Sequence, residues 1–124
     1  MIPKEVLFVA LGGSLGAVLR YLVMTLENSN TFPWGTLSVN LIGSFLLGCL
    51  VCAITMHGII SNEMMLFLGV GVLGSFTTLS TYSVDTIRLF ESGMWLHLFG
   101  YIFSTAIIGP LLAYFGWRIT SLIS

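Results

Sequence analysis

The sequence predicts an all-α integral membrane protein with four transmembrane helices. Of its 124 residues, 56% are hydrophobic and only 7% are charged, whereas a soluble domain carries about 25% charged residues. The mean hydropathy is +1.03. The few charged residues flank long apolar stretches, with Arg20 as the exception. Such a chain cannot cover a soluble surface with charge, and its apolar stretches suit a lipid bilayer.

The flanking charges divide the chain into four apolar segments, which form one domain over residues 1–124. The segments cover about residues 6–26, 35–56, 64–84 and 98–117, each close to the ~20 residues that a helix needs to cross a bilayer. Turn signals separate them at residues 28–34, 57–58 and 92–93. We expect the charged stretch at 85–95 to form a short amphipathic piece on the membrane surface.

The first segment carries a packing motif and one cation inside the predicted span. Gly12 and Gly16 have the G-x-x-x-G spacing, which lets two helix backbones approach closely. Arg20 lies well inside the end of the segment, where a guanidinium must reach the interface or bond to groups within the protein. Two roles are open for Arg20. It is either a fixed positive charge that favours anions in a vestibule or a structural clamp on a loop or a broken helix end.

The second segment carries a stripe of small and polar side chains at intervals of four residues: Thr36, Asn40, Ser44, Gly48 and Cys52. The Asn40 carboxamide must find partners in hydrocarbon, and its N–H groups suit a desolvated anion. A hydrogen bond to a neighbouring helix would explain Asn40 equally well. Cys49 and Cys52 have no His or carboxylate near them in sequence, so we interpret them as buried thiols and not as a redox or metal site.

The third and fourth segments carry the remaining polar positions. Near the middle of the third, the chain reads Gly74-Ser75-Phe76-Thr77-Thr78-Leu79-Ser80-Thr81-Tyr82. Polar, break-prone backbone at that depth is tolerated only against protein or a water-filled cavity, where ion sites are built. We therefore predict a break near Gly74 and a role in permeation or transport. In the fourth segment, Tyr101 and Thr105 share a helix face.

The positive charges are balanced across the predicted membrane. Lys4 and Arg118 lie on the side of the termini, whereas Arg20 and Arg88 lie toward the other side. Because an excess of Lys and Arg sets orientation, a balanced chain can insert both ways and form an antiparallel dimer, which supplies an inverted repeat. A single orientation decided by weaker loop signals is the alternative.

Several function classes lack their residues here. The sequence has no catalytic set, no phosphate loop and no basic tract for nucleic acid, so we predict that the chain is not an enzyme and binds no nucleic acid. A proton-coupled four-helix exporter remains an alternative, but it needs an ionisable group in the membrane. We expect Glu5 to lie outside the core, and Glu63 and Asp85 to be solvated.

Three stretches carry a family resemblance. They are residues 12–21 (GGSLGAVLRY), 35–45 (GTLSVNLIGSF) and 71–82 (GVLGSFTTLSTY). In order and spacing they resemble the signature stretches of the Fluc (CrcB) fluoride channels, and the likeness covers nearly the whole chain. It implies a dual-topology antiparallel dimer that exports fluoride passively through two pores at the subunit interface.

The resemblance also implies site residues. A structural sodium ion at the dimer centre would be held by the main-chain carbonyls of Gly74 and Thr77, and Arg20 matches the vestibule arginine. The candidate fluoride pathway comprises Thr36, Asn40, Leu79, Ser80, Thr81, Tyr82, Tyr101 and Thr105. The family usually has Phe at both ends of its Phe-Ser-Thr-Phe stretch, whereas this chain has Leu79 and Tyr82.

The expected partners are fluoride, membrane lipid and a second copy of the chain or a paralogue. With a paralogue, this chain would be a non-conducting subunit of a heterodimeric channel. The resemblance implies a multi-pass location in the bacterial or archaeal cell (inner) membrane.

Overall fold

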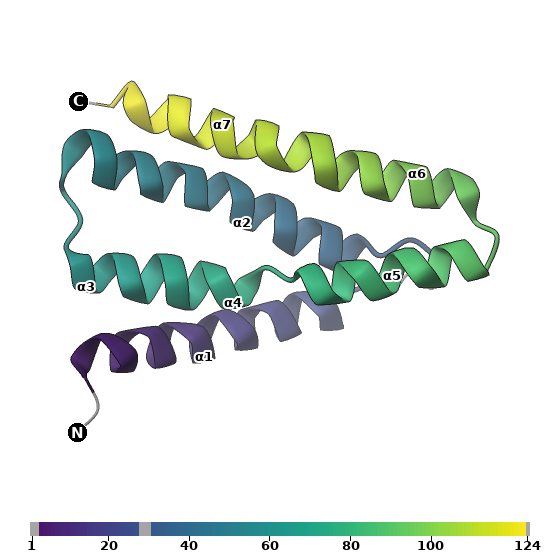
Figure 1. Cartoon of the computed structure of the whole chain (residues 1–124), viewed down its shortest axis with the longest axis horizontal. Coiled ribbons are helices and arrows are strands. Elements are labelled where there is room, and N and C mark those ends of the chain that lie inside the picture. Colours follow the sequence, from purple (N-terminus) through teal and green to yellow (C-terminus); the bar gives the residue numbers. More distant parts are fainter. Residues whose placement is uncertain (1–2, 28–30, 124) are drawn as a thin grey trace.

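The structure is a computed structural model that describes residues 3–27 and 31–123, so residues 28–30 of the predicted first loop lie outside the described part. Four helical runs of this part are long and apolar enough to cross a membrane: Lys4–Thr25, Trp34–His57, Asn62–Glu91 and Trp95–Ser121. They form an elongated bundle in which both termini and the connection between the second and third runs lie at one end (Figure 1). The predicted all-α fold with four long apolar helices is confirmed.

The helices within these runs follow one another with few interruptions. The first run is α1 (Lys4–Thr25), and the second is α2 (Trp34–Cys52) followed by the π-helical segment η1 (Ala53–His57). The third run contains α3 (Asn62–Met65), the π-helical η2 (Leu66–Leu73), α4 (Gly74–Phe76) and α5 (Leu79–Glu91). The fourth contains α6 (Trp95–Phe103), the π-helical η3 (Ser104–Ile108) and α7 (Gly109–Ser121).

The third run is longer than the sequence predicts. Residues 85–91 do not form a separate surface piece but continue α5 to Glu91. Asp85 and Leu89, one helical turn apart, are 4% and 3% exposed. One face of α5 is therefore buried beyond the predicted end of the segment. The expectation that Asp85 is solvated is wrong for the same reason.

Glycines set the closest helix contacts of the bundle. A Cβ atom on Gly12 or Gly16 would overlap the main-chain carbonyl of Phe67 or Val72, respectively, both in η2. On the other side of the bundle, a Cβ on Gly48 of α2 would overlap the Ala113 carbonyl of α7. Only a residue without a side chain permits backbones to lie this close. The expectation that Gly12 and Gly16 serve packing is confirmed.

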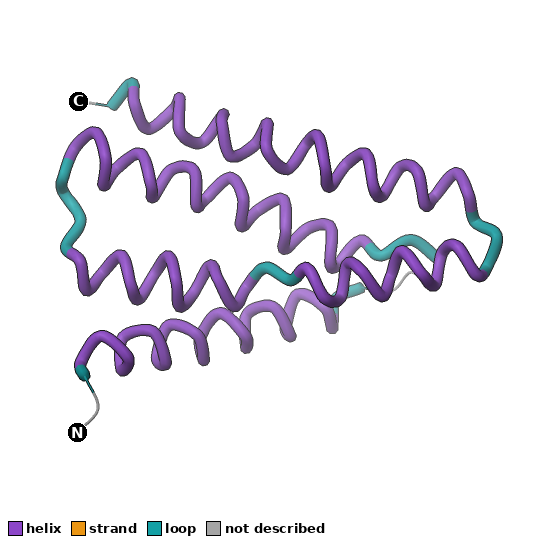
Figure 2. The backbone as a smooth tube through the Cα atoms, viewed as in Figure 1, coloured by secondary structure: helices purple, strands orange, loops and turns teal. Residues whose placement is uncertain are grey.

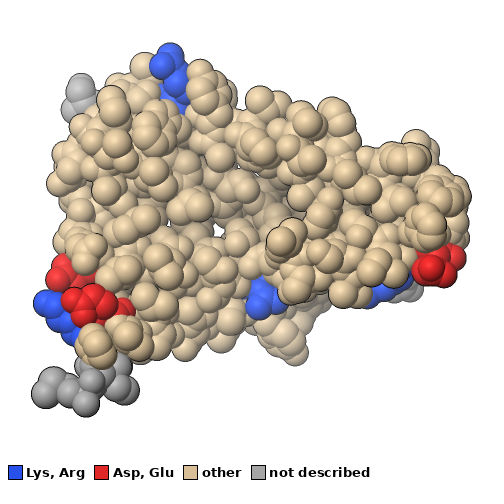
Figure 3. Space-filling view, viewed as in Figure 1, with Lys and Arg blue, Asp and Glu red and all other residues tan. Residues whose placement is uncertain are grey.

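Most of the charged side chains lie toward the two ends of the bundle. Figure 3 shows most of the charged residues of this face near its two ends. At the end with the termini, Lys4 and Glu63 form an exposed ion pair of 3.3 Å. Charge at the ends and apolar surface between them is what a bundle that crosses a bilayer requires.

Candidate functional site

The candidate site is built around two extended residues in the third run. Thr77 has a ψ angle of 158° and Thr78 has φ and ψ angles of −151° and 118°, so both leave helical geometry between α4 and α5. Figure 2 shows this short loop in the middle of the run. Gly74, where the sequence predicts the break, is helical, with φ and ψ angles of −61° and −35°. The backbone thus becomes extended at Thr77 and Thr78, on the α5 side of the predicted break at Gly74.

Asn40 of α2 binds both main-chain groups of Thr78. Its Oδ1 atom accepts a hydrogen bond from the Thr78 N–H at 2.8 Å, and its Nδ2 atom donates to the Thr78 carbonyl at 3.1 Å. In a regular helix the Thr78 N–H would donate to the Gly74 carbonyl four residues earlier. Asn40 therefore replaces the hydrogen bonds that extended backbone loses, and it frees the Gly74 carbonyl from that partner.

Arg20 of α1 binds the end of α4. Its Nε atom donates to the Ser75 carbonyl at 2.9 Å. Carbonyls at a helix end lack partners within the helix, and a charged donor satisfies one of them strongly. This contact is the kind that the clamp role requires, and the vestibule role of Arg20 stays a prediction.

A cavity of about 310 Å³ adjoins the extended residues. We call it the mid-bundle cavity, and its lining is Asn40, Gly43, Ser44, Leu47, Gly69, Leu73, Gly74, Thr77, Thr78, Leu79, Tyr82 and Thr105. It joins polar groups of α2, the α4–α5 connection and η3, with no charged residue among them. Thr105 is notable because its Oγ1 atom is buried without a hydrogen-bond partner among the described residues.

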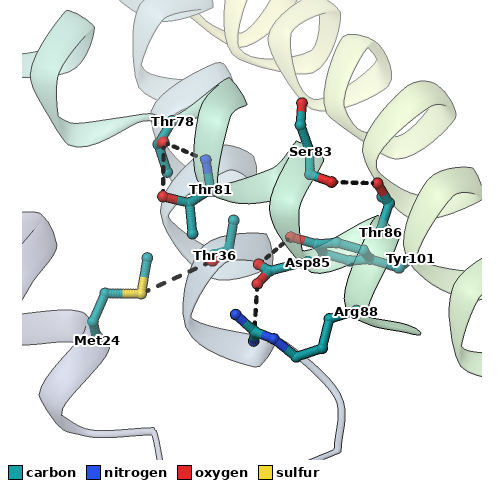
Figure 4. Close-up of polar contacts among 9 residues, drawn as sticks. All are labelled: Met24, Thr36, Thr78, Thr81, Ser83, Asp85, Thr86, Arg88 and Tyr101. Atoms are coloured by element: carbon teal, nitrogen blue, oxygen red, sulfur yellow. Dashed lines mark hydrogen bonds and ion pairs between the residues drawn. The ribbon is translucent and has the colours of Figure 1, made fainter. Parts of the chain in front are cut away.

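A second cavity of about 370 Å³ lies near the other end of the candidate pathway. This end cavity is lined by residues of α1, the start of α2 and α5, including Glu27, Thr36, Thr81, Asp85 and Arg88. Figure 4 shows Thr36, Asp85 and Arg88 close together there, with Tyr101 beside them. Thr36 is buried at 2% exposed. Ser80, by contrast, is exposed on the surface of this single chain.

Two tyrosines lie between these cavities. The ring centroids of Tyr82 and Tyr101 are 5.0 Å apart, and Tyr101 is fully buried. Phe32 packs edge-on against Tyr101 with centroids 5.6 Å apart. Leu79 lines the mid-bundle cavity, although it is 74% exposed overall. The structure thus brings seven of the eight candidate pathway residues to the two cavities or the ring contacts, with Ser80 on the outside.

Sequence reasoning missed three participants in this arrangement: Phe32, Thr78 and Asp85. Asp85 had a detectable signal, because it lies three residues after Tyr82 and four before Leu89. On a continuous helix these three residues share a face. Phe32 and Thr78 had no comparable signal, since their roles depend on contacts with α6 and α2.

The comparison with known proteins decides the family. The family model described as "CrcB-like protein, Camphor Resistance (CrcB)" matches residues 7–117. The chain belongs to the CrcB family. It is 44% identical over 117 residues to the fluoride-specific ion channel FluC of Oceanobacillus iheyensis, covering 94% of this chain and 91% of that protein.

Other CrcB relatives carry the same name. A FluC protein of Thermus thermophilus is 44% identical over 119 residues, covering 94% of each chain. That of Agrobacterium fabrum is 52% identical over 93 residues, covering 72% of this chain and 74% of the relative. These relatives are named as ion channels, which are not enzymes. With its four long apolar helices, this CrcB chain is a multi-pass membrane protein.

The contact between Arg20 and Ser75 predicts that the α4–α5 connection loosens in Arg20→Met. The Ser75 carbonyl would lose its charged donor, at a cost of about 1 to 3 kcal/mol. Hydrogen–deuterium exchange read by mass spectrometry should then show faster exchange at residues 75–81.

The control is Arg118→Met, which removes a guanidinium from the last turn of α7 and should leave exchange at 75–81 unchanged. Equal protection in the wild type and in Arg20→Met would mean that this bond does not hold the connection.

Proposed function

We propose that this chain is a fluoride-selective ion channel that exports fluoride passively and so lowers its cytoplasmic concentration. The name of its CrcB relatives supports the ion. The observation that carries the proposal here is the mid-bundle cavity, which is lined by neutral polar groups from three helical runs. One of them is the buried Thr105 hydroxyl, which has no hydrogen-bond partner in the part of the chain that the structure describes. A buried hydroxyl without a partner is costly, and a permeating anion would relieve that cost.

The donors of this cavity suit a small, strongly hydrated anion. A selective path must replace the water of fluoride with hydrogen-bond donors and the electropositive edges of aromatic rings. Asn40 has two amide N–H groups, and its bond to Thr78 uses one of them. The second N–H, the Thr105 hydroxyl and Tyr82 remain for the ion. A fixed cation in this cavity would bind fluoride too tightly for release, and the lining contains none.

The proton-coupled exporter remains the second candidate because of one observation. Asp85 is a buried carboxylate on the third run, at 4% exposed, and an exporter of this kind needs an ionisable group in the membrane. Both oxygens of Asp85 already have partners, Arg88 and Tyr101. A paired carboxylate is less suited to exchange protons with each substrate, which favours the channel.

We further propose an antiparallel dimer of two copies, or of this chain with a paralogue, with the third helix broken at residues 77–78 near the two-fold axis. The balance of Lys4 and Arg118 against Arg20 and Arg88 supports dual insertion. Gly74 is exposed on the single chain, so the surface beside the extended residues is open to a second copy.

The proposed sodium ion fits the chemistry of this surface. Among the described residues there is no group of His, Cys, Asp or Glu that could hold a metal, so main-chain oxygens are the relevant ligands. The Gly74 carbonyl lacks its regular helical partner, since the Thr78 N–H donates to Asn40, and Thr77 is extended. Carbonyls of unwound helices are hard oxygen ligands of the kind that coordinate sodium. A sodium ion bound by these carbonyls from both subunits would hold two copies together.

The proposed location is the inner membrane of a bacterial or archaeal cell, where export of fluoride lowers its cytoplasmic level. The relatives from the bacteria Oceanobacillus, Thermus and Agrobacterium support a bacterial cell.

The function is tested by fluoride efflux from liposomes that contain the purified chain. With a potassium gradient, valinomycin and no pH gradient, a fluoride electrode should record rapid fluoride efflux. A chloride electrode should record no chloride efflux from chloride-loaded vesicles under the same conditions. Efflux that requires a pH gradient would instead support the exporter. No efflux under either condition, but efflux after a paralogue is added, would identify a non-conducting subunit.

In the same assay, Asn40→Asp should abolish fluoride efflux. The substitution is nearly isosteric, but it replaces two donors with a negative charge beside the anion path. Because an aspartate cannot donate to the Thr78 carbonyl, hydrogen exchange at residues 75–81 is measured as a control, to show whether the α4–α5 connection is still protected in the variant. Efflux at the wild-type rate would reduce Asn40 to a structural role.

The departure at Leu79 and Tyr82 predicts unequal roles for the two positions. Tyr82 offers a ring edge and a hydroxyl to the ion, whereas Leu79 offers neither. In liposomes, Tyr82→Ile should stop fluoride efflux and Leu79→Phe should preserve or raise it. Normal efflux in Tyr82→Ile combined with a block in Leu79→Phe would reverse the assignment.

Dual insertion predicts that a topology reporter fused to the C-terminus is found on both sides of the membrane. Adding two lysines after Ser124 should bias the reporter to the cytoplasmic side, because added positive charge favours that side. A wild-type reporter on one side only, at every expression level, would contradict the antiparallel dimer.

A further inference from the structure

Asp85 is a buried carboxylate in which each oxygen accepts a hydrogen bond. Its side chain is 6% exposed, and its two oxygens have different partners. The Oδ1 atom accepts from Arg88 Nη1 at 3.3 Å, and the Oδ2 atom accepts from the Tyr101 hydroxyl at 3.0 Å (Figure 4). A carboxylate removed from water is tolerated only when it is paired and hydrogen-bonded.

Arg88 is the cation that makes this burial possible. The charged residues that line the end cavity are Glu27, Asp85 and Arg88, so Arg88 is the single positive charge facing two carboxylates. Its own side chain is 68% exposed. The guanidinium thus stays hydrated while the carboxylate that it binds is desolvated. Removal of Arg88 alone is therefore costly, because it leaves the Asp85 carboxylate buried without a compensating charge.

The pair determines how the Tyr101 hydroxyl is used. A phenol can donate one hydrogen bond, and the Tyr101 hydroxyl donates its hydrogen bond to Asp85. The Tyr101 ring is thereby held at its hydroxyl end, and the ring packs against Tyr82 with centroids 5.0 Å apart. Tyr82 in turn lines the mid-bundle cavity. A continuous set of contacts therefore leads from Arg88 through Asp85, Tyr101 and Tyr82 to that cavity.

We propose that Arg88 is a positioning residue for ion permeation, which holds Asp85 so that Asp85 fixes Tyr101 and, through it, the Tyr82 ring beside the mid-bundle cavity. This role rests on the proposed channel function. It assigns no direct contact between Arg88 and the ion. Arg88 acts instead by keeping one aromatic wall of the path in a single orientation.

The test compares fluoride efflux from liposomes for Arg88→Met, Arg88→Lys and the wild type. Loss of one partner of a buried charge pair should lower the efflux rate about tenfold or more in Arg88→Met. Arg88→Lys should restore most of the rate, since an ammonium can also bind the Asp85 carboxylate. Arg118→Lys, which replaces the guanidinium in the last turn of α7 and keeps the balance of positive charges that dual insertion requires, should conduct like the wild type.

A second comparison separates positioning from direct attraction of the anion. If Arg88 acts through Asp85, Arg88→Met should have no further effect on efflux in an Asp85→Asn background, because residues that act as a unit are not additive. The same fold-loss in both backgrounds would mean that Arg88 attracts the ion directly, and the proposal would be overturned.

A spectroscopic readout keeps the inference independent of conduction. The ultraviolet difference spectrum between the wild type and Arg88→Met should contain a tyrosine perturbation, and this perturbation should vanish when both proteins carry Tyr101→Phe. An unchanged spectrum would overturn the positioning role even if efflux falls. If the wild type itself carries no fluoride, the proposed function fails, while the spectrum still decides whether Arg88 holds Tyr101.

Discussion

The whole arrangement depends on satisfying extended backbone in the middle of an apolar bundle. Within a membrane, a main-chain N–H or C=O without a partner costs several kcal/mol. The Thr77 N–H still donates to the Leu73 carbonyl, but the Thr78 N–H donates to Asn40 in place of the Gly74 carbonyl. Two side chains from other helices bind this interrupted segment. Asn40 binds both main-chain groups of Thr78, and Arg20 binds the Ser75 carbonyl. Without these contacts, the extended residues would leave main-chain groups unpaired in an apolar bundle.

The glycine contacts make these bonds geometrically possible. Gly12 and Gly16 bring α1 against η2 at backbone contact, so Arg20, one turn after Gly16, is carried to the end of α4. On α2, a Cβ at Gly43 would overlap the Thr77 side chain, and Asn40 lies one turn before Gly43. The small residues therefore contribute more than close packing. They set the separations at which two polar side chains can reach the same interrupted segment from different helices.

The sequence predicts the first two helical runs closely because apolar length and flanking charge are local properties. Residues 6–26 and 35–56 lie within one or two residues of the helical runs Lys4–Thr25 and Trp34–His57. The interruption is less accessible to such reasoning. Gly74 is the residue with the greatest backbone freedom in its stretch, yet the extended residues are Thr77 and Thr78. Their position follows from where Asn40 and Arg20 can reach, across 38 and 55 residues of sequence. The expectation for Asp85 failed for a related reason. A charged residue predicts the end of a buried helix face, but the bonds of Asp85 with Tyr101 and Arg88 allow the buried face of α5 to continue past it.

The two cavities of the proposed path differ in the charge of the residues that line them. The mid-bundle cavity is lined by neutral groups, so an anion there would meet donors whose attraction is short in range and easily exchanged. The end cavity carries fixed charges, and its arginine is already committed to Asp85. An unpaired Arg88 would attract anions to the end cavity, whereas an unpaired Asp85 would repel them from it. Pairing the two cancels both effects at close range and leaves the hydroxyl and aromatic groups between the cavities to discriminate among ions. Under the proposed function, the ion pair between Asp85 and Arg88 is thus a condition for weak, selective binding in the middle of the bundle.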